Sequence, residues 1–380
     1  MNEEHYDYII AGTGCAGLSL VVHLIRSGQF ANKKLLLIDQ DKKQKNDRTW
    51  CFWEKKPGIF QSVVYKEWTQ LLFKNDNFRK ELRIEPYTYK LIQGGDFYKY
   101  CFEIINANPN ITFLQGSIDD IFSSDGVGVV IAGGKKFTAQ YVFNSIFSVP
   151  KLNRKEYWLH QHFRGWKIKT PKPAFDSNVA TLMDFSTDQH NGTTFFYVLP
   201  FSETEALIEF TLFSESLLDD DKYESALQNY IKNTLGITQY DIVERENGII
   251  PMTNVRFSPG NDQIVNIGTA GGQTKGSSGY TFNFTQKHSA AIVECLKQDK
   301  NPLQANQHNR RHHFYDSVLL NILHHKTLPG DHIFTELWRK NAAAKVLEFL
   351  DNESTIGTEL QIITSLPILP FSKAALSELL

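Results

Sequence analysis

The sequence predicts a mixed α/β fold (α+β overall), in which a parallel-sheet domain is interleaved with an antiparallel-sheet domain and followed by a helical C-terminal region. Three observations predict it. A glycine-rich turn lies between two apolar strands near the N-terminus, strand-like segments fill residues 157–215, and a helical pattern runs almost unbroken from residue 301. The 380 residues, 41% of them hydrophobic, suffice for two or three domains with a large core.

The N-terminal glycine turn stands in a complete supersecondary unit. Residues 6–11 (YDYIIA) form a short strand, GTGCAG (12–17) follows at once, residues 18–27 are helical, and residues 34–39 (KLLLID) form a second strand that ends in an acid. Strand, G-x-G-x-x-G, helix, strand and acid in this order are typical of a Rossmann-like dinucleotide-binding domain. A glycine-rich turn in another kind of α/β protein is the alternative.

Each residue of this unit has a physical role toward a dinucleotide. Gly12 permits the tight turn, Gly14 lets the backbone approach a pyrophosphate, and Gly17 lets the helix pack closely on the strand. The helix N-terminus offers unpaired N–H groups and a partial positive charge, and Ala16 within the motif is predicted to contact the cofactor there. Asp39 can accept hydrogen bonds from a ribose.

The chain after the second strand departs from a regular βαβ order. The segment NDRTWCFWEKKPG (46–58) is irregular, which favours FAD over a nicotinamide cofactor, and residues 61–92 form a strand-rich excursion. A helix over 95–108 and strand-like runs then return to the parallel sheet, at 111–114, 126–132 and 141–146.

The middle of the chain is predicted to be antiparallel. VATLMDF (179–185), TTFFYVLPF (193–201) and EALIEFTLF (205–213) are rich in β-branched and aromatic residues, and a three-residue turn joins the last two. A helix is predicted over about 218–235 and another over 286–297.

A second strand leads into glycines at residues 264–272. Gly268, Ala270 and Gly271 of this turn carry backbone N–H groups at an expected helix start. We expect them to reach the same cofactor from the other side. The FAD-binding domain is therefore predicted to comprise residues 1–60, 93–150 and 250–300. The substrate domain is predicted to comprise 61–92 and 151–249, and residues 301–380 form a C-terminal helical region with a candidate membrane contact.

Composition and charge exclude several partners and sites. Lys and Arg number 40 and Asp and Glu 42, so a net charge of −2 gives no attraction to nucleic acid. The four cysteines are too scattered for a disulfide framework or a zinc site. Five histidines lack acidic or cysteine neighbours at ligand spacing, so no metal is expected and they are interpreted as a polar helix face: His308, His312, His313, His324 and His325.

No segment has the pattern of an export signal or a membrane span. The N-terminus MNEEHYDYII lacks a basic region followed by an apolar one, and no run of about 18 apolar residues occurs. We therefore expect a cytoplasmic protein.

Seven sequence blocks carry a resemblance to a known family. They are GTGCAGLSL (12–20), NDRTWCFW (46–53), MDFSTDQHNGTTFFYVLP (183–200), LIEFT (207–211), IGTAGGQTKGSSGYTF (267–282), VLEFL (346–350) and LPILPF (366–371). With these blocks the chain resembles, nearly end to end, the bacterial lycopene β-cyclases, FAD-dependent enzymes of the aromatic-hydroxylase-like flavoprotein group. Gly276 stands where that family usually has a proline, and Thr269 where flavoproteins usually have an aspartate.

The resemblance implies an isomerase of the intramolecular lyase type. Lycopene is cyclised at both ψ ends, through γ-carotene, to β-carotene, with no net redox change. FAD is required in its reduced form, with NAD(P)H as the implied electron donor. The alternatives are an FAD-dependent monooxygenase or dehydrogenase that acts on an apolar substrate, and a pigment-binding flavoprotein without activity.

The resemblance maps the family's acidic residue onto Glu209. In ALIEFTL, Glu209 shares a strand face with Leu207 and Phe213, which would raise the pKa of the carboxyl and keep it protonated for attack on an alkene. From the residues alone, a solvated Glu on an edge strand is the alternative. Asp184, within LMDF, is predicted to orient Glu209 or to take the final proton, or else to make structural hydrogen bonds.

Arg48 and several aromatic residues are further candidates. Arg48 is predicted to pair with a cofactor phosphate or to hold its loop against Asp47. Aromatic rings can stabilise a carbocation by cation–π attraction, although most rings at this spacing belong to a core: Trp50, Phe52, Trp53, Phe195, Phe196 and Tyr197.

The implied substrate suggests a membrane partner. Lycopene is about as long as the ~30 Å apolar core of a bilayer, so we expect the protein to be peripherally associated with the inner face of the cell membrane. Residues 312–326 (HHFYDSVLLNILHHK) place Phe314, Val318 and Ile322 on one stripe, which fits a helix in the headgroup plane or equally one packed in the core. The apolar segment 361–371 is a second candidate contact.

Overall fold

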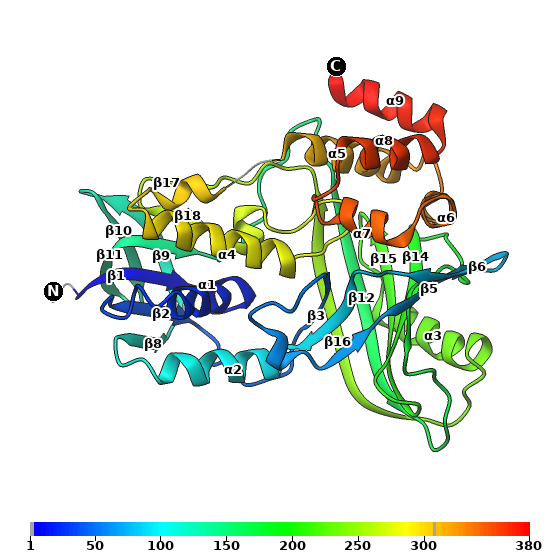
Figure 1. Ribbon diagram of the computed structural model, residues 1–380, viewed down its shortest axis with the longest axis horizontal. Coiled ribbons are helices and arrows are strands. Elements are labelled where there is room, and N and C mark those ends of the chain that lie inside the picture. Colours follow the sequence, from blue (N-terminus) through cyan, green and yellow to red (C-terminus); the bar gives the residue numbers. More distant parts are fainter. Residues whose placement is uncertain (1–3, 307–308) are drawn as a thin grey trace.

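The computed structural model describes residues 4–306 and 309–380 (Figure 1). Its first sheet confirms the predicted parallel sheet: strands β18, β11, β1, β2 and β8 pair in parallel in that order. Strands β17, β10 and β9 extend it with antiparallel pairs. The bounds are β1 Glu4–Ala11, β2 Leu35–Asp39, β8 Ile111–Gln115, β9 Ile118–Ser124, β10 Val127–Ala132, β11 Lys135–Asn144, β17 Gly260–Asn261 and β18 Ile264–Asn266.

Three helices cover this sheet. Helix α1 (Cys15–Arg26) begins directly after the glycine loop and packs against α2 (Gly94–Asn106) and α4 (Phe282–Lys297). A Cβ atom at Gly17 would collide with the carbonyl oxygen of Gly12, so the close approach of helix and loop requires glycine there. The predicted role of Gly17 in packing therefore has a direct steric basis.

The second sheet confirms the predicted antiparallel region. Its seven strands follow the order β16–β12–β15–β14–β13–β5–β6, and only the β13–β5 pair is parallel. The bounds are β5 Gln70–Asn75, β6 Phe78–Arg83, β12 Trp158–Lys169, β13 Val179–Asp184, β14 Thr193–Pro200, β15 Glu205–Ser214 and β16 Asp241–Thr253.

A three-stranded sheet connects the two larger ones. Strands β3 (Thr49–Glu54), β7 (Thr88–Gln93) and β4 (Lys66–Trp68) form it in that order. The predicted excursion over 61–92 therefore divides, because β4 and β7 pair with β3 whereas β5 and β6 join the seven-stranded sheet. The domain boundaries themselves stay a prediction.

The two faces of the seven-stranded sheet have different covers. We call the face under α3 (Asp220–Asn229) and the adjoining π-helical turn Tyr230–Thr234 the outer face; it carries Phe196, Ile208 and Phe210. The inner face lies under the C-terminal helices, which stand apart from α3 in Figure 1. These are α5 Arg310–His324, α6 Gly330–Lys340, α7 Ala343–Leu350, α8 Ile356–Ser365 and α9 Ile368–Leu379.

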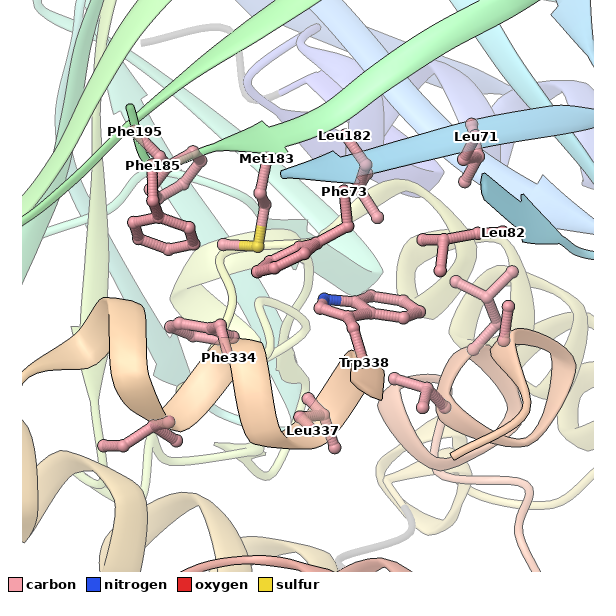
Figure 2. Packing of buried hydrophobic residues seen from close by; sticks show 14 of the residues in the cluster. Leu71, Phe73, Leu82, Leu182, Met183, Phe185, Phe195, Phe334, Leu337 and Trp338 are labelled. Carbon is pink, nitrogen blue, oxygen red and sulfur yellow. The ribbon is translucent and has the colours of Figure 1, made fainter. Parts of the chain in front are cut away.

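Large apolar side chains join the C-terminal helices to the inner face. Figure 2 shows Phe334 and Trp338 of α6 directed at the strands that carry Phe73 and Met183, and Leu337 on the lower side of the same helix. All five side chains belong to one buried cluster. The helical region is therefore part of the main core and fixes one wall of the space beneath the sheet.

Helix α5 corrects two predictions. Val318 is 6% and Ile322 0% exposed, so the interpretation of this stripe as a membrane contact is wrong and its alternative, core packing, is confirmed. His312 is also fully buried, and its Nε2 lies 3.3 Å from Glu359 Oε1 of α8. The interpretation of His312 as part of a polar, solvent-facing helix face is therefore wrong. His308 lies outside the described residues. Within the two described ranges, no helix is long and apolar enough to cross a bilayer.

Candidate functional site

A cavity of about 450 Å³ lies between the parallel sheet and the inner face of the antiparallel sheet. At one end it is bordered by the start of α1, with Gly14, Cys15 and Ala16, and by the second glycine turn. At the other end it is bordered by Glu209 of β15 and Glu246 of β16. We call it the glycine-lined cavity.

The glycine end fits a dinucleotide. Gly14 is the N-cap of α1 and makes no side-chain cap, so the first N–H groups of the helix face the cavity without a capping side chain. No heavy atom lies within 4 Å of a Cβ built on Gly14, so a ligand has room beside the backbone. Arg48 borders the same cavity. These features are the ones a pyrophosphate needs.

The other predicted cofactor residues lie at different distances from this cavity. Asp39 accepts hydrogen bonds from the Thr13 backbone N–H at 2.6 Å and from Thr13 Oγ1 at 3.1 Å, so it holds the glycine loop in place. The Arg48 guanidinium donates to the Asp47 backbone carbonyl at 3.0 Å. Gly12 and Gly17 shape the loop from behind and do not border the cavity.

The second glycine turn is a short 3₁₀ helix, Gly268–Gly271, and the following helix α4 begins only at Phe282. Gly268 and Thr269 border the glycine-lined cavity. Ala270 lies outside its lining, and Gly271 borders a separate cavity of about 140 Å³ instead. The turn therefore reaches the predicted cofactor space through its first two residues.

The opposite end of the cavity holds a pair of carboxyl groups. In the register of the sheet, Glu209 of β15 and Glu246 of β16 both lie opposite Gly165 of the intervening strand β12. Glu209 Oε1 accepts a hydrogen bond from Thr211 Oγ1 at 2.6 Å, and Glu246 Oε2 accepts one from Thr49 Oγ1 at 2.6 Å. Glu246 was not predicted from the sequence.

Burial first, and then the neighbouring Glu246 carboxylate, raise the pKa of Glu209 to about 8. Burial likewise raises the pKa of Glu246, while its hydrogen bond from Thr49 and the positive charge of Arg48 act in the opposite direction. The other titratable groups close to Glu209 are neutral at pH 7 and carry no positive charge: Cys51, Tyr197 and Tyr280. Glu209 therefore keeps its proton near neutral pH.

A second cavity, of about 310 Å³, lies beneath the C-terminal helices. Its walls are mostly apolar and include Phe213, Phe314, Leu337 and Phe371. We call it the apolar cavity. Tyr197, Ser278 and Tyr280 border both cavities, so these three residues are the partition between them. An apolar molecule in this cavity would point one end at the partition and, behind it, at Glu209.

Asp184 does not take part in this site. Phe196 lies opposite Asp184, whereas Tyr197 lies opposite Glu209, and consecutive residues of β14 point to opposite faces. Asp184 is 0% exposed on the outer face, forms an ion pair with Lys74 at 2.8 Å, and accepts a hydrogen bond from the Tyr230 hydroxyl. Its position fits the structural alternative and not the orientation of Glu209.

The predicted aromatic residues divide between site and core. Tyr197 borders both cavities, Trp50 borders the glycine-lined cavity and Trp53 the apolar one. Phe196 stacks on Tyr230 at the outer face, with ring centroids 3.8 Å apart. Phe195 and Phe52 are buried and border neither cavity. In the described part of the chain, no group of three or more His, Cys, Asp or Glu side chains could hold a metal ion.

Solved structures with the same fold include a flavoprotein and a protein in complex with FAD. A geranylgeranyl bacteriochlorophyll reductase-like protein from Thermoplasma acidophilum superposes with a TM-score of 0.69 at 12% identity, over 100% of both chains. A flavoprotein/dehydrogenase from Cytophaga hutchinsonii gives 0.65 at 10% identity, over 99% of both chains. HpxO from Klebsiella pneumoniae, solved in complex with FAD, gives 0.63 at 12% identity, over 96% of this chain and 100% of that one. The predicted FAD-dependent flavoprotein fold is thereby confirmed.

The sequence comparisons are more specific. A lycopene beta-cyclase from Paracoccus sp. is 26% identical over 254 residues, which cover 65% of this chain and 61% of that relative, less than two thirds of its length. The family model described as "Lycopene cyclase protein" matches residues 7–376, almost the whole chain. The protein therefore belongs to the lycopene cyclase family.

Proposed function

We propose that the protein is a lycopene β-cyclase, which converts lycopene through γ-carotene to β-carotene. The observation that carries this proposal is the position of the buried Glu209 carboxyl, whose pKa burial raises to about 8, behind the partition between an apolar cavity and a glycine-lined cavity. A site of this kind can deliver a proton to a hydrocarbon that offers no polar group for binding. The apolar walls supply the affinity for such a molecule.

The proposed reaction is an isomerisation and balances without any redox change. The O–H bond of Glu209 breaks and a C–H bond forms at the terminal double bond of one ψ end, which leaves a cation. The cation is attacked by a neighbouring double bond and a C–C bond closes the ring. A ring carbon then loses a proton to a carboxylate of the Glu209 and Glu246 pair, which restores the acid for the next ring closure. One end reacts at a time, which accounts for γ-carotene as the intermediate.

Aromatic side chains support the cationic stage. Tyr89, Tyr197 and Tyr280 border the glycine-lined cavity near Glu209, and the hydroxyls of Tyr89 and Tyr280 are 3.3 Å apart. Their rings attract a positive charge through the cation–π effect and bring in no competing nucleophile stronger than a phenol. Tyr197 and Tyr280, as members of the partition, would stand beside the reacting end of the substrate.

We propose FAD as the cofactor, in its reduced form and with NAD(P)H as electron donor. When bound, reduced FAD supplies an electron-rich ring that stabilises positive charge next to it. The α1 N-terminus with Gly14 and Ala16, together with Gly268, would hold the pyrophosphate, and Arg48 would neutralise its charge. The fold shared with an FAD complex supports this assignment.

We propose that the protein acts at the inner membrane surface, and that a surface other than α5 makes the membrane contact. Leu360 of α8 and Ile368, Leu369 and Leu376 of α9 are exposed large apolar residues, Leu369 at 75%. Ile368 is also part of the lining of the apolar cavity. This α8–α9 patch therefore adjoins the cavity, and a hydrocarbon dissolved in lipid could enter there without crossing water.

Expression in a lycopene-accumulating host tests the proposal. We expect the column profile to change from lycopene to β-carotene with transient γ-carotene, and the purified protein to show a flavin spectrum. Oxygenated pigment, formed with stoichiometric consumption of NADPH, would identify the monooxygenase alternative. Gly14→Val provides the cofactor control, since the side chain would occupy open space in the cavity and should exclude flavin from a folded protein.

A further inference from the structure

We propose that Glu246 is a positioning residue that keeps the reactive proton on Glu209, and that Gly165 is the opening through which the two carboxyl groups meet. The inference deepens the proposed function and rests on it only for the identity of the substrate. Three strands carry the residues concerned: β15 and β16 each pair with β12, which lies between them in the sheet.

The register of the sheet brings the two acids together. Glu209 on β15 and Glu246 on β16 each lie opposite Gly165 on β12, so one strand separates them. Any other residue at 165 would fill that space, because a Cβ there would be 2.9 Å from Glu246 Cγ and 3.0 Å from Leu207 Cδ1. The missing side chain lets the carboxyl groups approach over the middle strand.

The hydrogen bonds of the two carboxyl groups leave one oxygen of Glu246 open to accept a hydrogen bond from Glu209. Thr211 donates to Glu209 Oε1 and Thr49 donates to Glu246 Oε2, so one oxygen of each acid is already satisfied by a hydroxyl. Glu246 Oε1 is buried and has no donor among the described residues. Glu209 borders the same cavity across Gly165, and the two carboxyl groups shift each other's pKa, so the open Glu246 Oε1 is the acceptor available to a proton on Glu209.

The surroundings decide which acid holds the proton. Around Glu209 stand only groups that are neutral at pH 7, from β3, β14 and the loop before α4: Cys51, Tyr197 and Tyr280. Near Glu246, the Thr49 hydroxyl and the positive charge of Arg48 favour the carboxylate form, and the carboxylate of Glu244 opposes it. The negative charge is therefore better placed on Glu246, and the proton on Glu209.

This arrangement solves a problem particular to an apolar substrate. A hydrocarbon cannot hydrogen-bond to the acid, so it can neither orient the acid nor hold its proton in place. An ionised Glu246 does both from the other side of Gly165. Its carboxylate can accept a hydrogen bond from the protonated Glu209, and its negative charge makes loss of the Glu209 proton to solvent unfavourable.

The test compares Glu246→Gln with Glu244→Gln, which removes a carboxylate two residues away on the same strand. Glu244 accepts its hydrogen bond from Asn46 at 2.7 Å and does not border the glycine-lined cavity. For the wild type we expect cyclisation to fall as pH rises through about 8. In Glu246→Gln the fall should occur at least one pH unit lower, with a tenfold or larger loss at pH 7.5 and a much smaller loss at pH 6. Glu244→Gln should stay within half a pH unit of the wild type.

A second readout does not depend on activity. The infrared band of a protonated carboxyl in the resting, flavin-bound protein should be present at pH 7 in the wild type. At pH 7 it should be absent from Glu209→Gln and clearly weaker in Glu246→Gln, where it should disappear at a lower pH than in the wild type. Gly165→Ala, which moves Glu246 without removing its charge, should also lower the pH at which the band disappears.

The two readouts separate the two proposals. An unchanged pH limit and an unchanged infrared band in Glu246→Gln would overturn the positioning role, whatever the substrate. A band that titrates as predicted in a protein without cyclase activity would uphold the carboxyl pair and overturn only the proposed function.

Discussion

Each face of the seven-stranded sheet carries a buried acid with apolar neighbours in the sequence. The acid on the outer face is paired with a cation, whereas the acid on the inner face lies near a second carboxyl group. On the outer face Asp184 is fully enclosed beside Phe196 and is paired with Lys74. On the inner face Glu209 borders a cavity, and its nearest charged neighbour is another carboxyl. Both acids have apolar residues on either side in the sequence.

From this difference we infer that the charge of the nearest partner, and not the flanking residues in the sequence, determines whether a buried acid is ionised or protonated. A carboxylate with a cation at 2.8 Å has its charge compensated and serves the fold. A carboxyl beside a like charge retains a proton and can give it away.

Glu209→Gln should lower cyclisation by about a hundredfold or more, because the side chain keeps its size and loses the transferable proton. Pigment formed per flavin-bound protein is the quantity to measure. Asp184→Asn is the matched change on the outer face and should retain at least half of the wild-type rate per folded molecule. A reversed result would place the acid chemistry on the outer face.

Asp184→Asn should instead lower the free energy of unfolding by about 2 kcal/mol, since Lys74 and the Tyr230 hydroxyl lose a charged partner. Urea unfolding checks this value. Combining it with Lys74→Met should cost less than the sum of the single changes, because the unpaired cation is then gone. Additive effects would mean that the ion pair contributes nothing.

The pH dependence of stability should come from the inner face. The pKa of Glu209 is about 8 in the folded protein against 4.5 for the free group, so the folded state binds more protons between these values. The stabilisation from this proton is complete below about pH 4.5 and is lost as pH rises through about 8. Denaturant unfolding across this range should show the slope in Asp184→Asn and a weaker slope in Glu209→Gln.

The smallest effect on stability should come from the exposed α8–α9 patch. Leu369→Glu with Leu376→Glu should change the free energy of unfolding by less than about 1 kcal/mol, because both side chains face solvent. The same protein should no longer float with liposomes that carry the wild type. Val318→Glu with Ile322→Glu serves as the core control and should unfold the protein. Flotation of the α9 variant would move the membrane contact elsewhere.

The parallel sheet and its glycine loop were predictable because the motif is local: the residues that make the turn, the helix start and the acid all lie within 39 positions. Glu209 could be named as a candidate from the resemblance and borders the cavity, while its role stays a prediction. Glu246 could not be named from the sequence, because its proposed role depends on its position opposite Gly165 in the neighbouring strand. Acids at alternate positions along a strand are equally typical of a solvated edge strand.

The face of Asp184 was not predictable for a related reason. The pairing of β13 with β14 is irregular between Thr181 and Asp184, and both Leu182 and Met183 join the inner-face cluster. A strict alternation therefore assigns the wrong face. The stripe of α5 failed differently, because the same apolar spacing serves lipid and protein alike.

The mass of the product formed in heavy water tests most directly whether an exchangeable proton is transferred to the hydrocarbon. After the protein has exchanged its acidic protons for deuterium, each ring closure should leave one deuterium in the product. β-Carotene from lycopene should therefore be two mass units heavier than in ordinary water, and it should contain no oxygen. Unlabelled β-carotene, or a pigment that has gained oxygen, would contradict the account.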